Sequence, residues 1–257
     1  MAEAESRGTL LRLLGGIAFR LRSPSSLQQN LKRHYVDIDF VGLRKQKKDI
    51  TKLFTDLGYS PRTRFNAMQG EFRLIFNDLE NERRVDIFLN VFEMSHKLDF
   101  SERLKIDKVT LPLADLLLTK LQVYEITERE YKDVISLLKD RDLGSTDQND
   151  TINEDYIAKL CSQDWGLWRT LHLNLERIES SLANYSLTPD EMGTVKIRME
   201  RLRKRIDSET KSFGWKMRAR VGDKVKWYEV PEADVEVVDS RPFHERVAGK
   251  PENSETK

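Results

Sequence analysis

The sequence predicts an α+β fold in which a mixed β-sheet is flanked by helices and followed by a C-terminal helical hairpin. Short apolar segments typical of strands, with one amphipathic helix among them, dominate the first hundred residues, whereas apolar residues recur at helical spacing from Thr110 onward. We therefore expect a sheet-containing core with its own helices over residues 1–145, a helical hairpin over 150–212 and an extension over 213–257. The extension is predicted to become a polar tail from about residue 239.

Composition excludes several classes of protein. The 257 residues include 44 basic and 43 acidic side chains, so the net charge of +1 draws the chain neither to nucleic acid nor to a membrane as a whole. The single cysteine, Cys161, cannot form an internal disulfide and is expected to be buried in a helix. The four histidines lack the spacing of metal ligands, which argues against a zinc site.

The N-terminal segment 7–20 has basic flanks and an apolar middle, a pattern that targeting segments share. Two acidic residues, Glu3 and Glu5, precede it, and no small-residue cleavage site follows. Its apolar run is far shorter than the ~20 residues that span a bilayer. We expect a soluble cytoplasmic protein in which this segment belongs to the fold.

A strand, two glycines and a helix follow one another in this segment. Residues 10–14 are predicted as a short buried strand, Gly15 and Gly16 interrupt it, and residues 17–22 have helical character. Glycine permits a tight turn and the close approach of a ligand, and the N–H groups at a helix start can face an anion such as phosphate. An ordinary strand-to-helix turn is the alternative interpretation.

The next predicted strand, residues 35–40 and ending near Gly42, carries Asp37 and Asp39 between apolar residues. Side chains two residues apart project from the same face of a strand, so both carboxylates point one way. Two neighbouring carboxylates repel each other unless a cation lies between them, and Mg²⁺ is the usual hard cation for such oxygens. The spacing favours a metal site, with a solvated edge strand as the alternative.

A third acidic residue lies in a predicted antiparallel hairpin. Residues 49–57 are first predicted as an amphipathic helix that ends at Gly58. Residues 72–76 and 84–88 then flank a polar turn, and Asp86 interrupts the apolar run of the second arm. Burying an unpaired carboxylate is costly, so we expect Asp86 opposite the first two aspartates, completing a three-carboxylate site. A solvated strand residue beside the neighbouring arginines is the alternative.

Two helices are predicted after the hairpin. The first spans about residues 112–121, and a capping box formed by Thr127 and Glu130 begins the second. Lys120 and Asp133 lie beside the apolar stripes of these helices. Periodicity alone gives both residues the role of surface charges.

The C-terminal half is predicted as a helical hairpin after a polar linker over residues 144–150. A capping box of Thr151 and Glu154 is expected to begin a long helix with a kink at Gly166, and a second box begins another helix at Thr188.

Two further features lie in this half. Beyond Phe213 we expect a small hairpin around Gly222 and Asp223. The outer face of the last hairpin helix is the best local candidate for binding a polyanion, because six basic residues gather there: Lys196, Arg198, Arg201, Arg203, Lys204 and Arg205.

The order of these motifs resembles that of the nucleotidyltransferase superfamily that includes DNA polymerase β. The resemblance rests on three short segments, Leu14-Gly15-Gly16, Asp37-Ile-Asp39 and Val85-Asp86-Ile-Phe88. The segments 111–121 and 131–134 are similar to the AbiEii-like branch, whose fold pairs a mixed-sheet catalytic half with a helical half. The resemblance covers about residues 10–140, and it departs from the family where Gly16 stands in place of a serine.

This resemblance implies a Mg²⁺-dependent enzyme that moves a nucleoside monophosphate from an NTP to a hydroxyl-bearing acceptor with release of pyrophosphate. Asp37 and Asp39 would hold one ion and, together with Asp86, a second ion near the acceptor, and Asp86 would act as general base. The two glycines would bind the phosphates. Lys120 and Asp133, on neighbouring helices, would complete the site.

Relatives in this branch include toxins of toxin–antitoxin pairs that modify tRNA, and enzymes that modify small hydroxylated molecules. The resemblance therefore implies a tRNA, small-molecule or protein acceptor and an antitoxin-type protein partner, and no DNA partner is expected. A catalytically inactive module of the same fold that binds a protein or RNA is the main alternative. A nuclease using the same carboxylates is a third, although its expected His or Lys base is missing nearby in the sequence.

Overall fold

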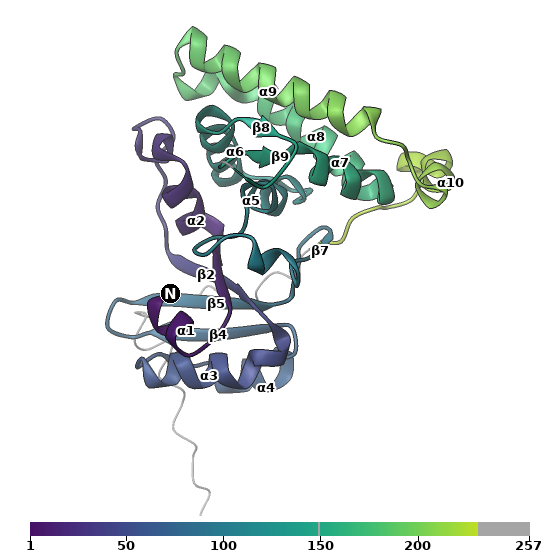
Figure 1. Cartoon of the computed structure of the whole chain (residues 1–257). Helices are drawn as coiled ribbons and strands as arrows, with labels where there is room; N and C mark the ends of the chain where they lie inside the picture. The colour runs from purple at the N-terminus through teal and green to yellow at the C-terminus, as the bar shows by residue number, and fades with distance from the viewer. Residues whose placement is uncertain (149, 231–257) are drawn as a thin grey trace, which may run out of the picture.

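A computed structural model describes residues 1–148 and 150–230, and the polar tail expected from residue 239 lies outside this part (Figure 1). The chain is α+β, as predicted, with a five-stranded mixed sheet at one end and a group of helices at the other. The strands of this sheet are β1 (Leu11–Leu14), β2 (Asp37–Gly42), β3 (Ser60–Pro61), β4 (Arg73–Asp78) and β5 (Arg83–Leu89).

The helices of the sheet-containing half are α1 (Ala2–Ser6), α2 (Gly15–Arg22), α3 (Lys47–Asp56), α4 (Thr63–Gln69), α5 (Leu113–Leu121) and α6 (Glu128–Asp140). Those of the C-terminal half are α7 (Glu154–Gln163), α8 (Trp165–Ser181), α9 (Pro189–Ser208) and α10 (Phe213–Val221). Two small sheets are also present, formed by β6 (Val91–Glu93) with β7 (Lys97–Asp99) and by β8 (Leu143–Gly144) with β9 (Ile152–Asn153).

The strand order of the main sheet is β1-β2-β5-β4-β3. Strand β5 runs antiparallel to β4, which confirms the predicted hairpin, and it runs parallel to β2. The parallel register sets Asp39 beside Asp86 and Asp37 beside Arg84. On the other side of β2, the antiparallel β1 sets Leu14 beside Asp39. The end of β1 therefore meets the acidic part of β2.

Alternation along the strands divides the sheet into two chemically different faces. Val85, Ile87 and Leu89 of β5 point into an apolar cluster to which α1 and α3 also contribute, and α3 lies below these strands in Figure 1. Arg84 and Asp86 alternate with these residues and so lie on the opposite face, toward α2. The acidic residues thus occupy the face of the sheet that the helical half adjoins.

The main apolar core runs without interruption from the sheet into the C-terminal helices. It includes Leu14 and Phe88 of the sheet, Leu117 of α5, and residues of α9 such as Met199 and Leu202, which are fully buried. Burial of this kind contributes ~1.5–3 kcal/mol per large apolar side chain. The same core therefore fixes the helices relative to the acidic face of the sheet.

Three details of the helical half correct the predictions. The residue that caps α7 is Asn153, whose side chain accepts a hydrogen bond from the N–H of Tyr156, and not Thr151. The long helix is broken into α7 and α8 at Asp164, and not kinked at Gly166, because the Asp164 side chain caps the start of α8. The prediction of a hairpin around residues 222–223 is wrong, because α10 is followed there by a short 3-10 turn.

Several predicted features are confirmed. Thr127 and Glu130 form the capping box of α6, and Thr188 and Glu191 form that of α9. Cys161 lies fully buried within α7.

Among the described residues, we find no helix with both the length and the apolar character needed to cross a bilayer.

Two helical glycines give a matched test of this packing. An added Cβ at Gly166 in α8 would lie 2.7 Å from the carbonyl oxygen of Trp227, whereas one at Gly193 in α9 would meet no atom within 4 Å. We expect Gly193→Ala to raise the free energy of unfolding by up to ~1 kcal/mol, the helix preference for alanine. Gly166→Ala should lower it, because the backbone contact outweighs that preference. Urea denaturation of both variants measures the difference, and equal stabilisation would contradict this packing.

Candidate active site

Three carboxylates from two adjacent strands meet on the acidic face of the sheet. One oxygen from each of Asp37, Asp39 and Asp86 can be chosen so that all three lie within 4.8 Å of one another. Asp86 is 1% exposed, whereas Asp37 and Asp39 are half-buried. The structure thus brings together the three acidic residues singled out in the sequence, and we refer to them below as the acidic triad.

Gly15 lies directly against this triad. It follows Leu14, the neighbour of Asp39 across the sheet, and has a left-handed backbone with φ of 63°. A Cβ at this position would collide with Oδ2 of Asp39, so only glycine fits both the turn and the contact. Helix α2 begins here with no side chain capping its first turn. For the N–H groups at this helix start, which lie beside the triad, no side-chain acceptor is found among the described residues.

At Gly16, two neighbouring side chains leave no room for a Cβ atom. A Cβ here would collide with Nη2 of Arg33, and with Cδ1 of Tyr35 at 2.6 Å. The Arg33 guanidinium lies over the Tyr35 ring, 4.7 Å from its centroid. The place that a serine side chain would occupy is therefore filled by Arg33. Arg33 belongs to the segment between α2 and β2, which the sequence marks only as an irregular connection.

Lys120 of α5 and Asp133 of α6 also meet. The Lys120 Nζ lies 3.1 Å from Oδ2 of Asp133, which is 2% exposed. Arg33 donates to both oxygens of the same carboxylate, each at 2.8 Å. Asp133 thus joins the two helices to the segment that packs on Gly16. These contacts replace the role of surface charge that periodicity alone gives to both residues.

Two arginines that the sequence reading did not include in the site hold Asp86. Nε of Arg73 lies 2.9 Å from Oδ1 of Asp86, and Nε of Arg84 lies 2.8 Å from Oδ2. A second nitrogen of Arg84, Nη2, lies 3.7 Å from Oδ2 of Asp37. The signal was present in part, because Arg84 precedes Asp86 by two residues and must share its face of the strand. The position of Arg73 depends on pairing between strands and has no such local signal.

The ionisation of Asp39 is perturbed by the surroundings of its carboxyl group. Burial raises its pKa to about 7, and repulsion from Asp37 and Asp86 adds to this effect. The positive charges of Lys120 and Arg84 oppose the rise without cancelling it. The carboxylate beside the glycine turn therefore lacks enough positive charge around it to ionise in its ordinary range.

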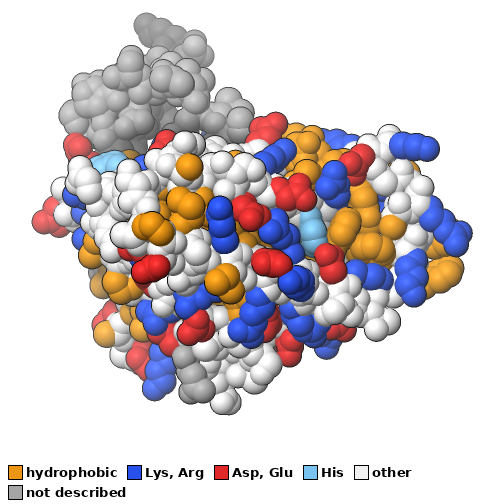
Figure 2. All heavy atoms as spheres, turned by 90° about the horizontal axis from the view of Figure 1, so that it is seen from above, with side chains coloured by type: hydrophobic (Ala, Val, Ile, Leu, Met, Phe, Trp, Pro, Cys, Tyr) orange, Lys and Arg blue, Asp and Glu red, His pale blue; other side chains and the backbone are white. Residues whose placement is uncertain are grey.

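The basic residues expected to form a polyanion-binding face on α9 are mostly engaged within the chain. Arg198 pairs with Asp142, Arg201 with Glu154, Arg203 with Glu179, Lys204 with Glu200, and Arg205 with Asp155 and Glu209. Figure 2, which views the molecule from the α9 side, shows basic and acidic side chains interspersed on this surface. Four of these residues, Arg198, Arg201, Arg203 and Arg205, thus attach α9 to neighbouring segments.

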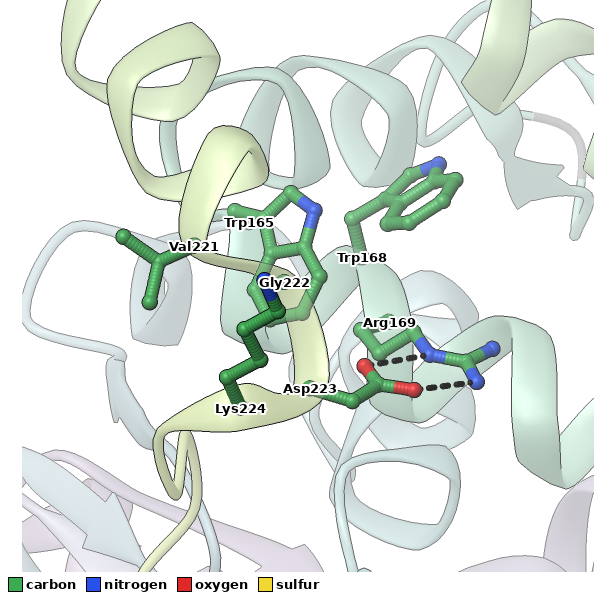
Figure 3. A pocket seen from close by; sticks show the side chains of 7 residues that line it. All are labelled: Trp165, Trp168, Arg169, Val221, Gly222, Asp223 and Lys224. Carbon is green, nitrogen blue, oxygen red and sulfur yellow. Dashed lines mark hydrogen bonds and ion pairs between the residues drawn. The ribbon is translucent and has the colours of Figure 1, made fainter.

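A separate hollow of about 610 Å³ lies between α8 and the segment after α10 (Figure 3). Trp165 and Trp168 form its apolar wall, and Lys224 lies at its rim. Its two other charged residues neutralise each other, because Arg169 donates to both oxygens of Asp223 at 3.1 and 2.9 Å. None of the triad residues lines this hollow.

The raised pKa of Asp39 makes a testable contribution to stability. A carboxyl whose pKa is higher in the folded than in the unfolded protein makes the folded state progressively less stable as the pH rises from about 4 to about 7. In the absence of divalent ions, we expect Asp39→Asn to raise the free energy of unfolding at pH 8 by about 1–3 kcal/mol. The gain should shrink toward zero as the pH falls to 4. Urea denaturation across this range measures it, and a pH-independent difference would contradict the assigned cause.

No family model matches this chain, and searches of curated proteins and of solved structures also give no significant match. The chemistry of the site is consequently inferred from its own geometry. That geometry consists of an acidic triad, a glycine turn that starts a helix, and four cationic side chains close to them, Arg33, Arg73, Arg84 and Lys120.

Proposed function

We propose that the chain is a metal-dependent nucleotidyltransferase that moves a nucleoside monophosphate from an NTP to a hydroxyl-bearing acceptor. The observation that carries the proposal is the convergence of Asp37, Asp39 and Asp86 on one face of the sheet, directly against Gly15 at the start of α2. Carboxylate oxygens suit Mg²⁺, and an uncapped helix start suits a phosphate. A nucleoside triphosphate bound to Mg²⁺ presents both groups together.

The donor set fits a magnesium ion at Asp37 and Asp39. Mg²⁺ binds oxygens at 2.0–2.1 Å, so two ligands of one ion lie roughly 3–4 Å apart, and the triad oxygens lie within 4.8 Å of one another. Burial, together with repulsion from Asp37 and Asp86, raises the pKa of Asp39, so a cation at this corner of the triad would be favourable. When bound, the ion would neutralise phosphate charge and lower the pKa of an attacking hydroxyl.

Residues of α2 and α5 would bind the phosphates of the nucleotide. Gly15 allows the backbone at the start of α2 to approach the phosphates, and the N–H groups of that turn would bind them. Lys120 would add a positive charge from α5, held in place by Asp133. Arg33 fills the space above Gly16, so the phosphate contact that a serine would provide there is not available to this chain.

The acceptor oxygen would form a bond to the α-phosphorus while the bond to the leaving pyrophosphate breaks. Asp86 is the proposed general base for the acceptor proton. Both of its oxygens contact arginines, so taking up that proton requires one oxygen to leave its guanidinium. Because Asp86 is 1% exposed, the acceptor must bring its hydroxyl close to the sheet surface.

A second function is favoured by the arginines themselves. Arg73 and Arg84 give the buried Asp86 positive partners without any metal, as a catalytically inactive module of this fold that binds a protein or RNA would require. Thermal stability measured with Mg²⁺ and each NTP separates the two functions. Stabilisation by a nucleotide together with Mg²⁺ supports the enzyme, and no response to any nucleotide supports the module.

The direct test is transfer of a labelled nucleotide. We expect the chain, incubated with Mg²⁺, each α-labelled NTP and total cell extract, to label an RNA, a protein or a small molecule. Asp39→Asn should reduce this labelling about 100-fold or more, since it removes a carboxylate that would hold the metal ion at the phosphates, and it should leave the fold intact. Asp49→Asn, at an exposed position in the first turn of α3, is the matched control and should retain activity. Substantial transfer by the Asp39 variant would contradict the proposal.

A further inference from the structure

We propose that Arg84 is a built-in cation of the acidic triad, which takes the place of a second metal ion, so that the chain binds one divalent ion between Asp37 and Asp39. This inference deepens the proposed function and rests on it. It replaces the expectation, drawn from the resemblance, that Asp86 helps to hold a second ion.

The contacts of Arg84 carry the inference. Its Nε lies 2.8 Å from Oδ2 of Asp86, and its Nη2 lies 3.7 Å from Oδ2 of Asp37. The guanidinium therefore bridges two members of the triad, as a shared metal ion would. Asp86 also receives Nη2 of Arg73 at 2.9 Å from Oδ1. Each oxygen of the third carboxylate thus already contacts a cation.

The β-sheet holds this arrangement in place. Arg84 and Asp86 are two residues apart on β5, and the parallel register sets them beside Asp37 and Asp39 of β2, respectively. All four side chains consequently share one face of two hydrogen-bonded strands. The Arg84 side chain is 22% exposed and that of Arg73 is 21% exposed, so both cations are largely enclosed with the acid they neutralise.

The distribution of charge points to a single vacancy for a metal. Three carboxylates face two arginines, which contact Asp86 and one oxygen of Asp37, while the nearby Lys120 is paired with Asp133. Among the described residues, no ion pair within 4 Å is found for Asp39, although one of its oxygens lies within 4.8 Å of an oxygen of Asp37 and of Asp86. One divalent ion at Asp37 and Asp39 would supply the missing charge. A second ion at Asp86 would meet the guanidinium of Arg84 at close range and be repelled by it.

The test is the number of Mn²⁺ ions bound by the full chain without nucleotide, counted by electron paramagnetic resonance. We expect one ion for the wild type and two for Arg84→Gln, because removing the guanidinium opens the Asp86 side of the triad. Arg83→Gln, next to Arg84 but on an exposed position of the same strand, is the matched control and should bind one ion. Asp39→Asn should lose the ion.

Each outcome decides a separate question. Two ions in the wild type, or one ion in both the wild type and Arg84→Gln, would overturn the role of Arg84 while leaving the proposed function standing. No binding by the wild type would overturn the metal site and with it the proposed function. If Arg84→Gln does not fold, the charge-neutral double variant Arg84→Gln/Asp86→Asn decides: one ion with an affinity within about threefold of wild type supports the inference, and loss of binding overturns it.

Discussion

The parallel pairing of β2 with β5 is the constraint on which the rest of the site depends. It places Asp39 beside Asp86 and Asp37 beside Arg84, so that like and opposite charges are fixed at close range by the backbone of the sheet. Carboxylates this close repel one another, and this repulsion adds to the larger effect of burial in raising the pKa of Asp39. A cation bound beside these carboxylates would therefore stabilise the folded chain.

The surrounding structure limits where that charge can enter. Arg73 and Arg84 already contact Asp86, and Asp133 holds Lys120 together with Arg33 on the helical side. The remaining side is formed by Gly15 and the start of α2, where the backbone approaches Asp39 most closely. Because one apolar core joins the sheet to the helices that carry these cations, the charges are positioned relative to one another by packing that extends through most of the described chain.

Local patterns in the sequence predicted much of this architecture. Strong signals such as the glycine pair after a strand, the Asp-Ile-Asp spacing and the capping boxes at Thr127 and Thr188 depend on neighbouring residues, and the structure contains each of these elements. The break at Asp164 was misplaced to Gly166, since an N-cap inside a continuous apolar pattern gives a weaker signal than a glycine. The sequence predicts a capping box from Thr151 to Glu154, whereas Asn153 caps the helix, since asparagine is at least as good a helix cap as threonine.

The parts that sequence reasoning missed are those created by pairing between distant segments. Arg73 reaches Asp86 only through the register of β4 and β5, and Arg33 reaches Asp133 across a separation of 100 residues. Neither contact corresponds to a periodic pattern in the sequence from which it could be predicted. Arg73 and Arg84 nonetheless neutralise part of the negative charge of the triad. The net charge of the site therefore depends on contacts that only the folded chain creates.

The measurement that tests the account most directly is the anomalous scattering of Mn²⁺ in crystals of the protein soaked with that ion. The account predicts one peak, in contact with oxygens of both Asp37 and Asp39, while the Arg84 guanidinium remains on Asp86. A peak bound to Asp86 in place of Arg84, or the absence of any peak at the three aspartates, would contradict it.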